Sequence, residues 1–95
     1  MRLPAEPLHP SELILDELNA RGWDINTLAR EMSGDCSVNY VALEFYLTIG
    51  KDNVGLRMGE DVIKDLARIF DISEDYFRNL EKSWVNFNSP NNDNT

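Results

Sequence analysis

Few side chains in this chain of 95 residues could carry out catalysis, and they lie far apart. The sequence contains one histidine, His9, and one cysteine, Cys36, so it can form neither an internal disulfide nor a Cys/His zinc site. It has no glycine-rich phosphate loop, and its carboxylates have the spacing of solvated helix faces, as with Asp61 and Asp65. These features predict that the protein is not an enzyme and has no metal site and no cofactor.

His9 and Cys36 each allow a functional and a structural interpretation. His9 could act as a ligand or a base, but it directly precedes Pro10, Ser11 and Glu12, a sequence typical of the start of a helix. We therefore expect His9 to make a local hydrogen bond. Cys36 lies in a predicted turn with no base or cation close to it, which favours a small structural residue over a reactive thiol.

The charge and hydropathy of the chain exclude some classes of partner. Its net charge is −8, and 42% of its residues are hydrophobic, enough for one domain with a single core. An acidic total opposes loose, charge-driven DNA binding and favours a basic protein partner. No apolar run approaches the roughly 20 residues of a membrane span, and no secretion signal is recognisable, so we expect a cytoplasmic protein.

The remaining function is molecular recognition, and the stretch from Trp23 to Gly50 must position the residues for it. Asp24 is suited to cap a helix, and the apolar residues that follow it have helical spacing. Gly34 can take the positive φ that ends this helix, and a second helix then begins at Ser37 or Asn39. Two short helices joined by a turn form the helix-turn-helix unit, whose second helix normally enters the major groove of DNA.

The charge of the second predicted helix opposes a role in DNA binding. No Lys or Arg occurs between Arg30 and Lys51, and the acids in that interval are Glu31, Asp35 and Glu44. Lys51 and Arg57 are the cations of the following loop at 48–59, where they either contact phosphates or are simply solvated.

Three further helices complete the prediction. The first begins at Pro10 or Ser11 and stops at Gly22, the fourth begins at Glu60, and the fifth is capped by Asp71 or Ser73. The last helix carries an aromatic stripe that is either core or a partner or dimer interface, formed by Tyr76, Phe77 and Trp84. We expect an irregular arm at 1–8, the folded domain at 9–87 and a disordered polar tail at 88–95.

Three stretches resemble the Xre-type helix-turn-helix domains, and specifically the HigA-type antitoxins of toxin–antitoxin modules. The family's opening helix is similar to HPSELILDEL at 9–18, with Ser11 where the family has glycine. Its second helix is similar to RGWDINTLAREM at 21–32, and its fourth and fifth helices closely resemble LRMGEDVIKDLARIFDISEDYFRNLEKSW at 56–84. The turn before the recognition helix is longer here than in the family, and the recognition helix lacks the family's basic residues.

The resemblance implies a compact, all-α, five-helix bundle that contains a helix-turn-helix and is lambda-repressor-like. It also implies a homodimer that binds duplex DNA, represses its own promoter as an antitoxin does, and binds a basic toxin protein. The family's DNA-facing positions fall here on Asn39, which could read adenine, and Tyr40, which could reach phosphate. Thr27 and Ser37 could add neutral contacts.

Two functions are consistent with these features. The first is a DNA-binding transcriptional regulator, whose contacts would be Thr27, Ser37, Asn39, Tyr40, Lys51 and Arg57. The second is a protein-interaction module on the same fold that has lost DNA binding and docks a basic protein partner, with anchors at Tyr40, Leu43 and Tyr46. The resemblance favours the first function, and the charge favours the second.

Overall fold

The computed structural model describes residues 8–53 and 55–88, and within these ranges the chain forms five α-helices, one short 3-10 helix and no strand. The elements are α1 (Pro10–Arg21), α2 (Ile25–Glu31), α3 (Cys36–Ile49), η1 (Gly50–Asp52), α4 (Glu60–Phe70) and α5 (Glu74–Asn88). The predicted all-α class is confirmed. The arm and the tail fall almost wholly outside the described residues, and Asn88, which we assigned to the tail, ends α5.

The first helix begins at a capping box centred on His9. The ring Nδ1 of His9 accepts a hydrogen bond from the Ser11 N–H at 3.0 Å, and the Glu12 carboxylate accepts one from the His9 N–H at 3.2 Å. The local hydrogen bond expected of His9 is therefore confirmed. The helix ends at Gly22, whose φ of 68° is the left-handed conformation that glycine adopts without strain.

The connection between α2 and α3 differs from the prediction at the start of α3. Asp24 caps α2 as expected, and Gly34 has the positive φ, 90°, that the turn requires. The Asp35 carboxylate then accepts the N–H groups of Ser37 and Val38 at 2.8 and 3.2 Å. Because the carboxylate of Asp35, two residues before Ser37, satisfies these free amides, α3 begins at residue 36 and not at Ser37 or later. Cys36 is therefore the exposed first residue of α3 and not part of the turn.

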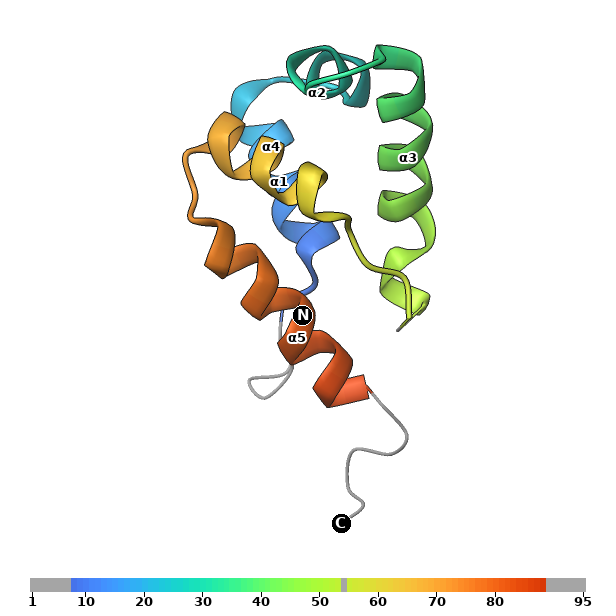
Figure 1. Cartoon of the computed structure of the whole chain (residues 1–95), viewed down its shortest axis with the longest axis vertical. Helices are drawn as coiled ribbons and strands as arrows, with labels where there is room; N and C mark the ends of the chain where they lie inside the picture. The colour runs from blue at the N-terminus through green and yellow to red at the C-terminus, as the bar shows by residue number, and fades with distance from the viewer. Residues whose placement is uncertain (1–7, 54, 89–95) are drawn as a thin grey trace.

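Figure 1 shows α2 across one end of the molecule, α3 along one side and α5 on the opposite side, leading towards the C-terminus. Each helix contributes to one core, with fully enclosed or nearly enclosed side chains at Ile14, Leu28, Leu43, Ile63 and Phe77. None of the helices in the described ranges has both the length and the apolar character needed to cross a membrane.

The aromatic stripe of α5 belongs mainly to the core. Phe77 is 0% exposed and Trp84 is 6% exposed, so of the two alternatives left open by the sequence these two residues follow the core, and their assignment to a partner interface is wrong. They share the inner side of α5 because they are seven residues apart, which is two helical turns. Tyr76, one residue away from Phe77, lies outside this stripe and is exposed. The cap of α5 is Ser73, whose hydroxyl accepts the Tyr76 N–H at 3.1 Å.

Candidate binding surface

Helix α3 is apolar on both its inner and its outer sides. Leu43 and Tyr46 face the core, whereas Val38, Val41 and Phe45 are 65%, 66% and 54% exposed. The outer residues, with the exposed Ala42, have the i, i+3, i+4, i+7 spacing of a single helix face. We call Val38, Val41, Ala42 and Phe45 the outer face of α3. It carries three of the six large apolar side chains that are exposed in the described residues.

A hollow of about 190 Å³ adjoins this face, and we call it the α3 groove. One wall is α3 itself, through Ala42 and Phe45, and the others are segment 56–59 and Val62 of α4. The lining is predominantly apolar and includes two methionines, Met32 and Met58. Apolar hollows with a few polar groups at the rim are typical of binding sites.

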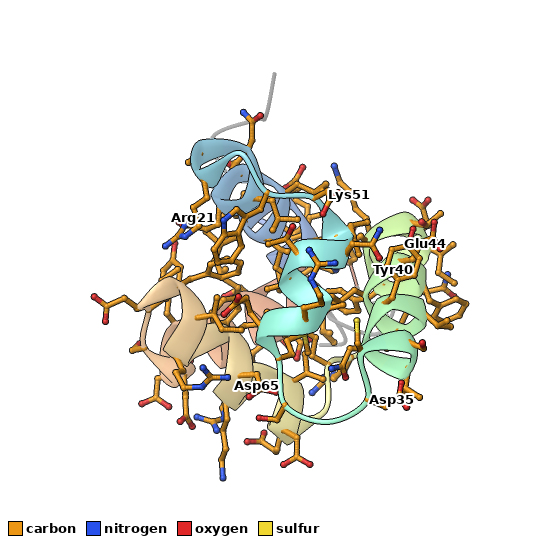
Figure 2. The ribbon with its side chains drawn as sticks, turned by 90° about the horizontal axis from the view of Figure 1, so that it is seen from above. Arg21, Asp35, Tyr40, Glu44, Lys51 and Asp65 are labelled. Carbon is orange, nitrogen blue, oxygen red and sulfur yellow. The ribbon has the colours of Figure 1, made fainter. Side chains whose placement is uncertain are left out.

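A second hollow lies next to the α3 groove and shares three lining residues with it: Met32, Asn39 and Val62. It differs in chemistry, because Asp61, Lys64 and Asp65 also line it. Asp65 accepts hydrogen bonds from both the N–H and the hydroxyl of Ser33 at 3.0 Å. Figure 2 shows Asp65 close to the turn between α2 and α3. Asp61 is exposed, and no ion pair of Asp61 occurs in the described ranges.

The pKa of Asp65 reflects two opposing effects. Partial burial raises it, but the hydrogen bonds from Ser33 and Arg68 outweigh burial and hold the pKa below its ordinary value. Asp65 therefore stays ionised and keeps its hydrogen bonds to Ser33 in the turn between α2 and α3. Asp61 is the carboxylate of the second hollow that remains available to a partner.

The structure does not support Asn39 as a base-reading residue. Its side-chain amide donates to the carbonyl oxygens of Ala29 at 3.2 Å and Ser33 at 3.0 Å, so it closes the turn between α2 and α3. Reading adenine requires the amide to donate and accept at the same time. Ser37 is exposed but lies two residues from Asn39, which places the two about 200° apart around the helix axis.

The other predicted DNA contacts are also engaged within the protein or face different surfaces. Thr27 donates its hydroxyl to Asp24 at 2.9 Å, and Tyr40 is half-buried against the core. Lys51 forms an ion pair with Glu12 of α1 at 2.7 Å, and Figure 2 shows it well apart from Asp35 at the beginning of α3. Arg57 is exposed at the wall of the α3 groove. Thr27, Asn39 and Lys51 are therefore already bonded to other groups of the protein.

The anchors proposed for a protein-interaction surface need a similar correction. Leu43 and Tyr46 are 3% and 6% exposed, and Tyr40 is half-buried, so none of the three presents a large free surface. The apolar character of α3 was recognised in the sequence, but the wrong residues were assigned to its outside. Val38, Val41 and Phe45 hold the exposed positions instead.

A buried carboxylate, Glu81, supports the groove from α5. Its Oε2 accepts hydrogen bonds from the Tyr46 hydroxyl at 2.9 Å and from the Met58 N–H at 2.8 Å. Glu81 thus joins α3 and segment 56–59, two walls of the groove, to the core. Sequence reasoning gave it no role, although an acid four residues after Phe77 and three before Trp84 interrupts the buried stripe of α5.

Aromatic packing around Glu81 brings His9 into the same cluster. The His9 ring stacks on Tyr46 with centroids 5.5 Å apart and meets the edge of Trp84 at 5.0 Å. Burial lowers the pKa of His9, an effect that Glu12 opposes and Lys51 adds to. Burial and the neighbouring Glu81 both raise the pKa of Tyr46 far above its ordinary value. His9 is thus favoured as a neutral acceptor at the start of α1.

No family model, no curated protein and no solved structure matches this chain. Within residues 8–53 and 55–88, no three His, Cys, Asp or Glu side chains are grouped so that they could hold a metal ion. The candidate site is therefore defined by its own geometry: an exposed apolar helix face, an apolar groove beside it and charged groups at their margin, which are the acids Asp61 and Asp65 and the cations Arg57 and Lys64.

Proposed function

We propose that this protein is a docking module that binds a basic protein partner through the outer face of α3. The observation that carries the proposal is that Val38, Val41 and Phe45 are each more than half exposed on one side of a single helix. A helix that is apolar on its outer as well as its inner side is normally covered by other protein on both. Clustered exposed apolar residues mark interaction sites more often than scattered ones do.

The charge around this face supports a basic partner. The segment between Arg30 and Lys51 contains no Lys or Arg, and its acids Glu31, Asp35 and Glu44 are all exposed. Lys51 is partly neutralised by its ion pair with Glu12. With a net charge of −8 on the whole chain, a cationic partner is attracted at long range and a polyanion is repelled.

A second candidate function is the DNA-binding regulator, an antitoxin-like autorepressor acting as a homodimer. Two observations favour it: α2 and α3 are joined by a short turn at 32–35, and the side of α3 away from the core is open. In that arrangement α3 acts as the recognition helix of a helix-turn-helix. Val38 and Ala42 then contact thymine methyl groups, and Arg57 contacts phosphate.

Site-specific photocrosslinking in cells tests the first function. A benzoylphenylalanine at Val41 should crosslink a basic protein, whereas the same group at the exposed Lys82 of α5 should not. The identified partner is then purified, and its affinity for the Val41→Gln variant is measured. We expect a loss of about tenfold, which corresponds to ~1.4 kcal/mol of apolar contact. Leu15→Gln is the matched control, since Leu15 is an exposed apolar residue of α1.

Fluorescence anisotropy with labelled duplexes separates the two functions. The docking function predicts no binding to the gene's own upstream duplex or to a random duplex, even at low salt. Binding to the upstream duplex alone, with a shallow salt dependence and sensitivity to Val41→Gln, supports the regulator instead and contradicts the docking proposal. An acidic partner, or an affinity that Val41→Gln leaves unchanged, also contradicts it.

A further inference from the structure

We propose that the α3 groove takes one large apolar side chain from a basic amphipathic helix of the partner. The same helix places a Lys or Arg over Asp61 in the adjoining hollow. This inference rests on the proposed docking function and adds to it a specific anchor pocket and the chemistry of the bound segment.

The groove has the size and lining for such an anchor. A cavity of roughly 150 Å³ lined by apolar side chains can hold a benzene molecule, and the α3 groove measures about 190 Å³. A phenylalanine, leucine or methionine side chain therefore fits. Met32 and Met58 lie in its walls, and methionine adapts to apolar groups of different shapes.

The neighbouring hollow determines the charge of the occupant. It shares Met32, Asn39 and Val62 with the groove, so the two hollows lie next to each other. Lys64 also lines this hollow, and the carboxylate of Asp65 is held by Ser33 and Arg68. Asp61 is therefore the carboxylate that we assign to an incoming cation. Residues three or four apart on a helix lie side by side, so one helix can supply both the apolar anchor and the cation.

A second copy of this chain is a poorer occupant than a basic helix. Each copy has a net charge of −8, and pairing two outer faces would bring together the exposed acids Asp35, the cap of α3, and Glu44 of each copy. Like charges brought together across an interface oppose association. Charge complementarity therefore selects a cationic helix from a different protein.

Selection from a displayed library of helical peptides, with their exposed positions randomised, tests the inference on the full-length protein. We expect enriched peptides to carry one Phe, Leu, Met or Trp and a Lys or Arg three or four positions away. Asp61→Lys should replace that cation by Glu or Asp in a repeated selection. Failure to enrich any peptide, or enrichment without this spacing and charge, overturns the inference.

Two substitutions on α3 distinguish the groove from the face as a whole. Ala42→Gln extends a polar side chain from the groove wall, whereas Val38→Gln changes the same outer face beyond the groove. Both residues are exposed and glutamine suits a helix, so both variants should keep the circular dichroism of the original. We expect Ala42→Gln to weaken a selected peptide at least tenfold and Val38→Gln less than threefold. Equal losses overturn the groove but leave the docking face intact.

The cellular partner separates failure of the groove from failure of the function. If photocrosslinking at Val41 still captures the basic partner while Ala42→Gln leaves its affinity unchanged, the proposed function stands and the anchor pocket is wrong. If selected peptides bind but compete with duplex DNA for α3, the groove is real and the docking function is wrong.

Discussion

Replacing Glu81 with leucine should destabilise the protein by about 2 kcal/mol. The carboxylate accepts hydrogen bonds from the Tyr46 hydroxyl at 2.9 Å and the Met58 N–H at 2.8 Å while being only 8% exposed. Leaving a buried hydroxyl unpaired costs ~2–3 kcal/mol, and the half-buried amide adds ~1 kcal/mol. Removing the buried charge also removes the cost of its desolvation, which stabilises the variant by ~1–2 kcal/mol and leaves a net loss of about 2 kcal/mol.

Urea unfolding followed by circular dichroism measures this loss. The midpoint should fall while the slope with denaturant stays constant, because the folded and unfolded surfaces change little. In thermal unfolding, ~2 kcal/mol corresponds to a fall in Tm of roughly 8–16 °C for a domain of this size. Glu81→Gln is the matched control: it keeps an acceptor oxygen, so we expect it to lose less than ~1 kcal/mol.

A double-mutant cycle isolates the hydrogen bond to Tyr46. Tyr46→Phe removes the hydroxyl but keeps the ring that stacks on His9. In the Glu81→Leu background it deletes the unpaired hydroxyl and should recover most of the ~2–3 kcal/mol that this group costs, whereas in the original protein it destabilises. Additive effects of the two substitutions, or a Glu81→Leu variant within ~0.5 kcal/mol of the original, would refute this account of Glu81.

Three further predictions concern stability. Asn39→Ala removes the amide that joins the carbonyls of Ala29 and Ser33, so urea unfolding should show a loss of ~1 kcal/mol. Gly22→Ala places a β-carbon at φ 68°, and although no atom lies within 4 Å of it, the strained backbone should lower the unfolding free energy by ~1 kcal/mol. Burial keeps the pKa of His9 in the folded protein below 6.5, so the unfolded chain takes up a proton first as the pH falls. Stability should therefore be full above that unfolded pKa and decline from pH 7.5 to 5.5. In urea unfolding His9→Asn should show a weaker decline over this range, where carboxylates with lowered pKa, such as Asp65, do not titrate.

Local interactions made the helix boundaries readable in the sequence. Asp24 and Gly22 act on backbone groups within three or four residues, so their side-chain chemistry alone indicated where α2 begins and α1 ends. The start of α3 was missed because two neighbouring acceptors competed. Asp35 lies before Ser37 in the chain and accepts the free amides at the start of the helix. Whether its carboxylate can reach them depends on the conformation of the turn.

Packing decided which apolar residues face outwards. Residues one position apart on a helix point about 100° apart, so turning α3 by roughly half a turn about its axis would exchange the buried Leu43 and Tyr46 for the exposed Val41 and Phe45. When a helix is apolar on both sides, the spacing of its apolar residues does not indicate which side faces the core. The same holds for α5, where Phe77 is enclosed and Tyr76 is exposed.

Contacts between residues that are distant in the chain could not be predicted from the spacing of residue types. Asn39 meets Ala29, Lys51 meets Glu12 and Tyr46 meets Glu81 across separations of 10, 39 and 35 residues. Each contact exists because the helices fold against one core, which brings these side chains together. Residue type and local order therefore decided where the helices form, and only their packing decided which side chains bind one another and which remain open to a partner.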